Sequence, residues 1–135
     1  KAKQLGAESG LPSSVKFGIM VETPAAALSI EEYCKEGIDF ISFGSNDLTQ
    51  LTLGLDRNNE RMIKLFDEMH PAMRFQFRHV ISTCRKYGVK TSICGELPSN
   101  REDAVRFFVA LGISSVSVNI DAIDKVRGWI ASAEA

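Results

Sequence analysis

The chain has 135 residues, enough for one domain at most, with 44% hydrophobic residues, 24% charged residues and a formal net charge of −1. This composition excludes disordered, collagen-like and low-complexity chains, and the balanced charge gives no field that favours nucleic acid or anionic lipid. A membrane span needs about 18 consecutive apolar residues, and no apolar run comes near that length, so we expect a soluble α/β domain.

The first half of the chain reads as a helix followed by two strand–helix units. Residues 1–10 predict a weak helix, and a short apolar run predicts a buried strand over residues 16–22. Residues 29–32 have the spacing of a capping box, which predicts a helix beginning there. A second strand is expected over residues 39–44.

The middle of the chain predicts mainly helix. Residues 47–50 open a short helix, and Pro71 fits the first position of a long helix that ends at Gly88. Apolar residues at helical spacing predict its buried face: Met73, Phe77, Val80, Ile81 and Cys84.

The last third predicts two further strand–helix units. Strands are expected over residues 89–94 and 113–118, with a second capping box at residues 99–102 and a last helix over residues 120–133. Four such units imply a parallel sheet with right-handed crossovers, as in doubly wound sheets and (β/α)8 barrels. A full barrel needs about 250 residues, so this chain could supply roughly half of one.

Two acidic residues follow the first two expected strands. Glu22 ends the first strand, and Asp47 lies just after the second. Carboxyl ends of parallel strands share one crevice, where two carboxylates could hold Mg²⁺ and leave its other positions to water or substrate oxygens. The alternative is that each acid is a helix cap or a surface residue.

Other candidates lie in the same crevice. The backbone N–H groups after Gly44 could bind an anion at a helix start, and Arg57 could meet a phosphate or carboxylate unless it is a plain surface arginine. Cys94 closes the third strand and could exchange a proton, whereas Cys34 and Cys84 fit buried core positions. Three cysteines without metal-type spacing indicate a reducing compartment, the cytoplasm.

Three motifs in order resemble those of the phosphoenolpyruvate-utilising enzymes. Residues 18–27 resemble the family's metal-site strand, residues 43–50 and 55–58 its second signature, and residues 92–96 its active-site cysteine loop. The resemblance covers about residues 15–130. The second signature most resembles the family's phosphoenolpyruvate synthases, whereas the Cys94 loop also resembles enzyme I of the sugar phosphotransferase system.

The resemblance implies roles for seven residues. Glu22 and Asp47 match the family's Mg²⁺ ligands, with Mn²⁺ as a possible substitute, and Cys94 matches the residue that moves a proton at the substrate's methyl carbon. The residues that match the pyruvate- or phosphoenolpyruvate-binding set are Glu22, Gly44, Ser45, Asn46, Asp47 and Arg57.

The resemblance also implies the C-terminal half, about four βα units over residues 1–135, of a phosphoenolpyruvate-binding (β/α)8 TIM barrel. The family's phosphohistidine and ATP-grasp domains have no counterpart here, so we expect a piece of a longer enzyme that is inactive alone. The alternatives are enzyme I, a pyruvate phosphate dikinase, or a stand-alone binding module without catalysis.

An isolated half-barrel leaves one sheet face and two strand edges open, so we expect it to form a homodimer or to self-associate otherwise. We expect the open inner face to carry either these residues or their neighbours along the strands: Phe17, Ile19, Ile41, Ile93 and Val116.

Overall fold

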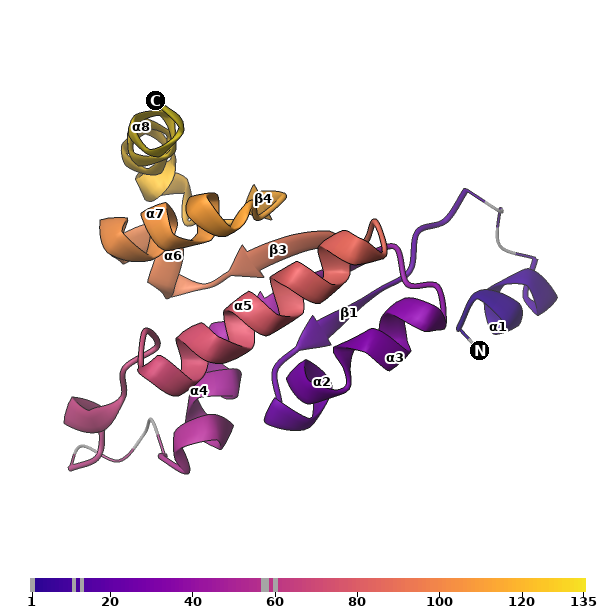
Figure 1. Cartoon of the computed structure of the whole chain (residues 1–135), viewed down its shortest axis with the longest axis horizontal. Helices are drawn as coiled ribbons and strands as arrows, with labels where there is room; N and C mark the ends of the chain where they lie inside the picture. Colours follow the sequence, from indigo (N-terminus) through magenta and orange to yellow (C-terminus); the bar gives the residue numbers. More distant parts are fainter. Residues whose placement is uncertain (1, 11, 13, 57–58, 60) are drawn as a thin grey trace.

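The structure, a computed structural model, describes residues 2–10, 12, 14–56, 59 and 61–135 (Figure 1). Its centre is a sheet in which neighbouring strands pair in parallel, in the order β1-β2-β3-β4. The strands are β1 (Gly18–Val21), β2 (Phe40–Gly44), β3 (Lys90–Cys94) and β4 (Ser115–Val116). The chain is therefore an α/β protein with a parallel sheet, as predicted, although β1 and β4 are shorter than their sequence patterns indicate.

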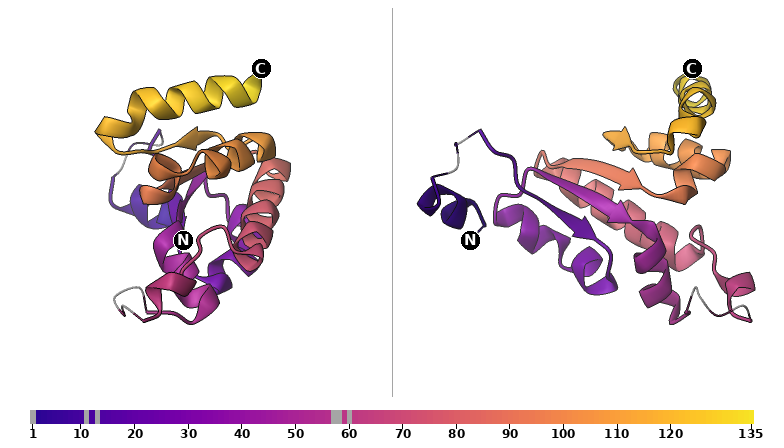
Figure 2. Two further views of the ribbon diagram at one scale, coloured as in Figure 1. Left: turned by 90° about the vertical axis from the view of Figure 1, so that its left-hand side faces the viewer. Right: turned by 180° about the vertical axis from the view of Figure 1, so that it is seen from behind.

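Helices fill the connections between the strands. The helices are α1 (Ala2–Glu8), α2 (Pro24–Leu28), α3 (Ile30–Lys35), α4 (Ser45–Leu53), α5 (Pro71–Lys86), α6 (Glu96–Asn100), α7 (Glu102–Leu111) and α8 (Ile123–Glu134), with 3-10 turns η1 (Ile63–Leu65) and η2 (Ile120–Ala122). Each strand pairs with the next strand in the sequence. When such neighbouring parallel strands are joined by right-handed crossovers, the connecting helices lie on the same face of the sheet. In the view from behind in Figure 2, the strands lie in front of α5.

The two faces of the sheet differ in burial because side chains alternate along each strand. Ile41, Phe43 and Ile93 point toward the helices and are completely buried. Met20 and Phe40 lie on the other face and are 44% and 41% exposed. Of the two sets expected for the open face, Ile41 and Ile93 lie instead on the helix-covered face, and the open face carries their strand neighbours.

Helix α5 forms the main layer over the sheet. The Phe77 ring contacts the edges of Phe43 from β2 and Phe108 from α7, with ring centroids 5.0 Å apart in both pairs. The predicted buried face of this helix is confirmed at all five positions. Pro71 occupies its first turn, and the His70 ring Nδ1 accepts a hydrogen bond from the Ala72 N–H at 3.2 Å.

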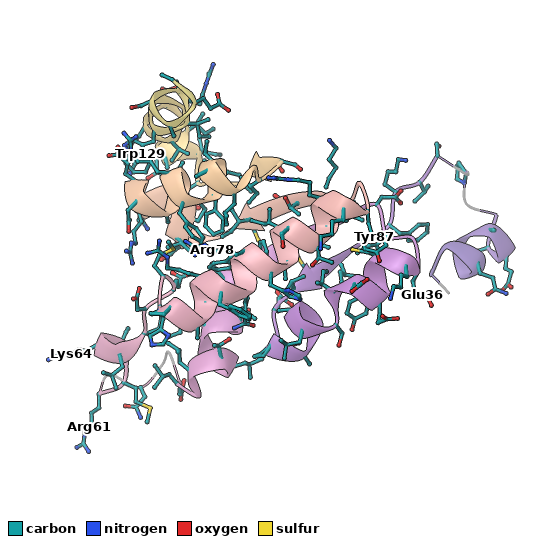
Figure 3. All side chains as sticks on the ribbon, viewed as in Figure 1. Glu36, Arg61, Lys64, Arg78, Tyr87 and Trp129 are labelled. Carbon is teal, nitrogen blue, oxygen red and sulfur yellow. The ribbon has the colours of Figure 1, made fainter. Side chains whose placement is uncertain are left out.

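Helix α8 adds a smaller core beside the sheet. Val105 from α7 packs with Ala122 and Val126, and Trp129 covers this cluster where α8 faces α7 (Figure 3). At the other side of the molecule, the Tyr87 hydroxyl after α5 donates to Glu31 Oε1 of α3 at 2.7 Å. Within the described part of the chain, no helix is long and apolar enough to cross a membrane.

Neither predicted capping box forms. Ser29 is the N-cap residue of α3, where the sequence predicts a helix start, but its side chain makes no capping hydrogen bond. The separate helix α2 before it is capped by Thr23, whose Oγ1 accepts from the Ala26 N–H at 3.0 Å. Ser99 lies inside α6, where its hydroxyl donates to the Gly95 carbonyl and accepts from the Asn119 N–H. One local and one tertiary hydrogen bond thus take the place of the predicted cap at Ser99.

Candidate functional site

The carboxyl ends of β1, β2 and β3 bring three predicted loops to one edge of the sheet. Val21 pairs with Phe43 in the register, so Glu22 follows next to Gly44. Gly44 pairs in turn with Cys94. The parallel register therefore places the Glu22, Gly44 and Cys94 positions in one row across three strands.

Gly44 leaves room for the Glu22 side chain. A Cβ atom built on Gly44 would lie 2.5 Å from Glu22 Oε1 and 2.6 Å from its Cγ, closer than real Cβ atoms approach other atoms. The Glu22 carboxylate therefore lies across the end of β2. Only a residue without a side chain permits this position.

Helix α4 begins immediately after Gly44, two residues earlier than the sequence predicts, and carries Asp47 in its first turn. Glycine at the N-cap offers no capping side chain, so the first N–H groups of the helix have no side-chain acceptor there. This nine-residue helix therefore presents N–H donors and the positive end of its dipole beside the Glu22 carboxylate.

Cys94 lies at the end of β3 on the open face of the sheet. Its thiol donates a long hydrogen bond to the Phe43 carbonyl, with Sγ and O 3.5 Å apart. The side chain is partly exposed and borders a shallow hollow of about 440 Å³ that Ser42 and Ser92 also line. The thiol is thus open to a small molecule bound beside Gly44.

Cys34 and Cys84 have a different environment, as predicted. Both are buried, their Sγ atoms lie 4.0 Å apart, and burial raises the pKa of Cys84 to about 12. Burial also raises the pKa of Cys34. These two thiols belong to the core between α3 and α5.

Gly95, in the cysteine loop, lies close to the start of α4. Its φ of +117° is a conformation that glycine adopts far more easily than other residues. A Cβ atom built there would lie 3.7 Å from Ser45 Oγ and 3.9 Å from Asn46 Nδ2. The two loops therefore pack against each other at this residue.

Glu68 is a site neighbour that sequence reasoning did not single out. It precedes α5, its buried Oε1 atom has no hydrogen-bond partner in the described structure, and burial raises the pKa of its carboxyl, which the nearby Ser45 hydroxyl lowers. Its distance of more than 20 positions from Ser45 leaves no local pattern that could connect the two residues. Only the packing of the segment before α5 against α4 brings them together.

Arg57 lies outside the described residues. Among those that are described, no group of three or more His, Cys, Asp or Glu side chains could hold a metal ion. The pair of Glu22 and Asp47 suits Mg²⁺, since this ion often takes one or two protein carboxylates and keeps its remaining positions for water and substrate oxygens. The space at Gly44 that accommodates the Glu22 carboxylate fits that assignment.

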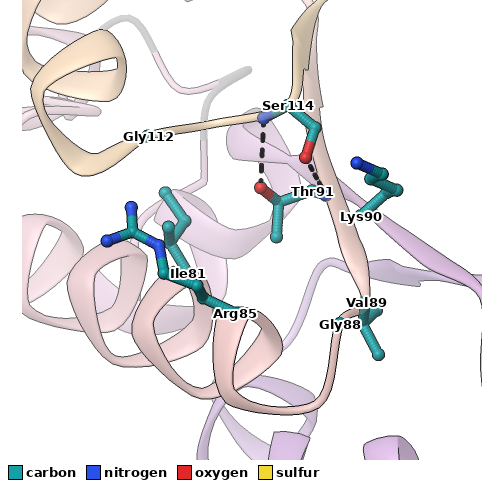
Figure 4. Close-up of a pocket in the computed structure, with 8 residues that line it drawn as sticks. All are labelled: Ile81, Arg85, Gly88, Val89, Lys90, Thr91, Gly112 and Ser114. Carbon is teal, nitrogen blue, oxygen red and sulfur yellow. Dashed lines mark hydrogen bonds between the residues drawn. The ribbon is translucent and has the colours of Figure 1, made fainter.

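A second hollow, at the amino ends of the strands, is lined by Arg85, Thr91 and Ser114 (Figure 4). Three of its polar side chains already have partners. The Arg85 guanidinium donates to the Leu111 carbonyl, and Thr91 and Ser114 exchange hydrogen bonds through their N–H and hydroxyl groups. These contacts join the ends of β3, α5 and α7, which is a structural role.

Comparisons with known proteins agree with the sequence resemblance. The family model "PEP-utilising enzyme, PEP-binding domain", where PEP is phosphoenolpyruvate, matches residues 1–135. A probable phosphoenolpyruvate synthase from Pyrococcus horikoshii is 54% identical over 133 residues, which cover 97% of this chain and 16% of that protein. The phosphoenolpyruvate synthases of Pyrococcus furiosus and Pseudomonas aeruginosa are 52% and 43% identical, covering 99% and 90% of this chain. The chain spans only 16% and 15% of the length of those two relatives.

Solved structures share the fold at low sequence identity. A citrate lyase from Burkholderia xenovorans matches with a TM-score of 0.66 and 21% identity, covering 98% of this chain and 42% of that one. RipC from Yersinia pestis has the same TM-score at 11% identity, covering 94% of this chain and 57% of that one. In both, the matching part is a portion of a longer chain.

Proposed function

Because this chain belongs to the family of PEP-utilising enzymes, as their PEP-binding domain, we propose that it forms the pyruvate- and phosphoenolpyruvate-binding part of a phosphoenolpyruvate synthase. The observation that carries the proposal is the row of Glu22, Gly44 and Cys94 across three strand ends. The complete enzyme would convert pyruvate, ATP and water to phosphoenolpyruvate, AMP and phosphate. Its other domains would supply the phosphohistidine, the ATP site and the other half of a (β/α)8 barrel, in the cytoplasm.

Substrate binding is assigned to the start of α4. The backbone N–H groups at the start of α4, after Gly44, would hold the carboxylate or phosphoryl oxygens of the substrate. Asn46 adds a side-chain amide at the same turn. Arg57, from the resemblance, would add a cation to the same anionic groups.

Proton transfer is assigned to Cys94. In the forward direction, a methyl C–H bond of pyruvate breaks, its proton passes to the sulfur of Cys94 in its thiolate form, which becomes a thiol, and the electron pair of the broken bond forms the enolate. The enolate oxygen then bonds to phosphorus while the phosphorus–nitrogen bond of the phosphohistidine breaks. The position of the thiol on the open face, beside Gly44, supports this role.

Glu22 and Asp47 would hold the divalent metal ion. A bound Mg²⁺ supplies positive charge that stabilises the enolate and phosphoryl oxygens. The two carboxylates come from neighbouring loops, so they would fix the substrate's oxygens relative to the Cys94 thiol. Each carboxylate would bind the metal ion and so orient the substrate's oxygens.

The test uses oxalate, which resembles the enolate of pyruvate and offers two oxygen ligands. In the full-length protein, Mg²⁺ should strengthen oxalate binding, as measured by calorimetry. Replacing both acids, Glu22→Ala with Asp47→Ala, should abolish the Mg²⁺-dependent part. Unchanged binding in the folded double variant would contradict the metal assignment.

A subtler variant tests the space at Gly44. Gly44→Ala should displace the Glu22 carboxylate and weaken Mg²⁺-dependent oxalate binding at least tenfold. The φ of Gly44 is −93° and the obstructed atoms belong to a flexible side chain, so the free energy of unfolding should change by less than about 1 kcal/mol. Gly128→Ala is the control, because a Cβ atom there meets nothing within 4 Å.

A further inference from the structure

Two of the three cysteines form a contact between helices that are far apart in the sequence. Cys34 lies in the last turn of α3, and Cys84 lies in the last turn of α5. Their Sγ atoms are 4.0 Å apart, and both are free thiols. The two residues are 50 positions apart, so a bond between their sulfur atoms would close a long loop of the chain.

The two sulfur atoms need only a short movement to reach bonding distance. A disulfide bond is about 2.0 Å long, so the sulfur atoms would have to approach each other by about 2 Å. Rotation of the two side chains about their Cα–Cβ bonds supplies most of this movement. Helix α3 has six residues and adjusts more easily than α5, which has 16. The folded arrangement therefore permits the bond without rearrangement of the sheet.

Burial limits what else these two thiols react with. Cys84 is 0% exposed and Cys34 is 5% exposed. Burial raises the pKa of both thiols, to about 12 for Cys84, so both react slowly with reagents in solution. Within the described part of the chain, the thiol that Cys84 contacts is that of Cys34.

The third cysteine lies on the opposite side of the sheet. The Cys94 thiol donates to the Phe43 carbonyl on the open face, whereas Cys34 and Cys84 belong to the core between the sheet and its helices. The sheet therefore separates Cys94 from the other two sulfur atoms. Within the described part of the folded chain, the contact favours a single pairing.

We propose that Cys34 and Cys84 form a site of reversible oxidation, at which a low-molecular-weight disulfide such as oxidised glutathione converts the two thiols to a disulfide that ties α3 to α5. A reducing compartment keeps the pair as thiols, and the disulfide forms when the thiol–disulfide balance shifts toward oxidation. The proposal goes beyond the proposed function and does not depend on it, since neither thiol lies at the candidate site.

The oxidation takes place in two exchange steps. When α3 opens locally, the Cys34 thiol loses its proton, and its thiolate attacks one sulfur of oxidised glutathione, whose S–S bond breaks to release one glutathione thiolate. The Cys84 thiol then loses its proton, and its thiolate attacks the Cys34 sulfur and releases the second glutathione thiolate. The two cysteine protons end on the two released thiolates. Two protein thiols are thus oxidised, and one glutathione disulfide is reduced to two glutathione thiols.

The disulfide would restrict the opening of α3. Helix α3 lies between β1 and β2 in the sequence, whereas α5 is the main layer over the sheet. A cross-link that closes a long loop acts mainly on opened and unfolded states, because it removes conformational freedom from them. The bond would therefore fasten the first strand–helix unit to α5 and slow its local opening.

Peptide mapping of the native full-length protein tests the proposal. After incubation with excess oxidised glutathione at pH 8, proteolysis should yield two peptides linked through Cys34 and Cys84, which dithiothreitol separates. Hydrogen exchange in α3, followed by mass spectrometry, should be at least about threefold slower in the oxidised protein than in the reduced protein. Cys34→Ala should abolish both effects. Cys94→Ser is the matched control and should leave both effects in place.

Three results would overturn the proposal. The first is native protein in which Cys34 and Cys84 stay free, or carry separate glutathione groups, after Cys94 has fully reacted. The second is a linked pair that forms only in urea-unfolded protein, because the native contact would then not direct the pairing. The third is a native linked pair without slower exchange in α3. Should Cys34→Ala not fold, peptide mapping of the wild type before and after dithiothreitol still decides the outcome.

Discussion

At the scale of single residues, the three cysteines show how position governs thiol chemistry. Cys94 ends a strand on the open face, whereas Cys34 and Cys84 face each other between two helices. A thiol reacts as its thiolate, so both exposure and pKa decide its reactivity. The burial of Cys34 and Cys84 and the strand-end position of Cys94 were predictable because the strand end and the helical spacing are local patterns.

We predict that iodoacetamide alkylates Cys94 in the native protein and leaves Cys84 unmodified at pH 8. A pKa of about 12 keeps Cys84 protonated, with about one thiolate in ten thousand at that pH. Its modification should increase about tenfold per pH unit until the pH reaches that pKa. Mass spectrometry of proteolytic peptides measures each site, and unfolded protein, in which all three react, is the control. Rapid modification of native Cys84 at pH 8 would contradict the assignment.

At the scale of secondary structure, short helices and side-chain caps were the least predictable features. The sequence correctly predicts a helix after Ser29, since α3 begins at Ile30 with Ser29 at its N-cap, but it misses the separate helix α2, which begins at Pro24 and is capped by Thr23. A capping box is a local pattern, so it does not indicate a short helix that precedes it and buries Ala27. The long helix α5 was predictable because Pro71 and a sustained apolar face agree.

This difference between two caps is testable. Thr23→Ala should lower the free energy of unfolding by about 1 kcal/mol, since it removes the hydrogen bond to the Ala26 N–H. Ser29→Ala should change it by less than about 0.5 kcal/mol, since the Ser29 hydroxyl caps no helix. Urea unfolding followed by circular dichroism measures both. Equal losses in the two variants would show that the hydrogen bond at Thr23 is not the stabilising interaction.

The candidate site was predictable to the extent that its residues follow strand ends. The positions of Glu22, Gly44 and Cys94 come from the alternation of strands and helices, which a sequence displays directly. The proximity of Glu68 to Ser45 arises from tertiary packing across a long separation, and the sequence contains no periodic signal for it. The space that Gly44 leaves for Glu22 likewise becomes visible only with side chains in place.

At the scale of the whole molecule, the sheet has one face covered by helices and one open. The open face combines the apolar side chains of Met20 and Phe40 with the small polar side chains of Ser42 and Ser92. Parallel sheets are normally buried on both faces. Another part of the same protein or a second copy of the chain would therefore stabilise this face.

We predict that the isolated chain self-associates, most simply as a two-fold dimer through this open face. Covering partly exposed apolar side chains such as Phe40 removes them from water, which favours association. Phe40→Ser should shift the protein toward monomer, whereas Phe75→Ser, at the exposed ring stacked on His79 in α5, should not. Sedimentation at low micromolar concentration measures this, and a well-folded monomer of the unaltered chain would refute the prediction.

We propose that this chain holds pyruvate between the start of α4 and the Cys94 thiol. Exchange of the pyruvate methyl protons with deuterated water, followed by proton NMR in the full-length protein with Mg²⁺, tests this proposal. Wild type and the Cys34→Ala control should exchange these protons, while Cys94→Ala should not, although it still binds oxalate with Mg²⁺. Exchange that persists at the wild-type rate in Cys94→Ala would contradict the account.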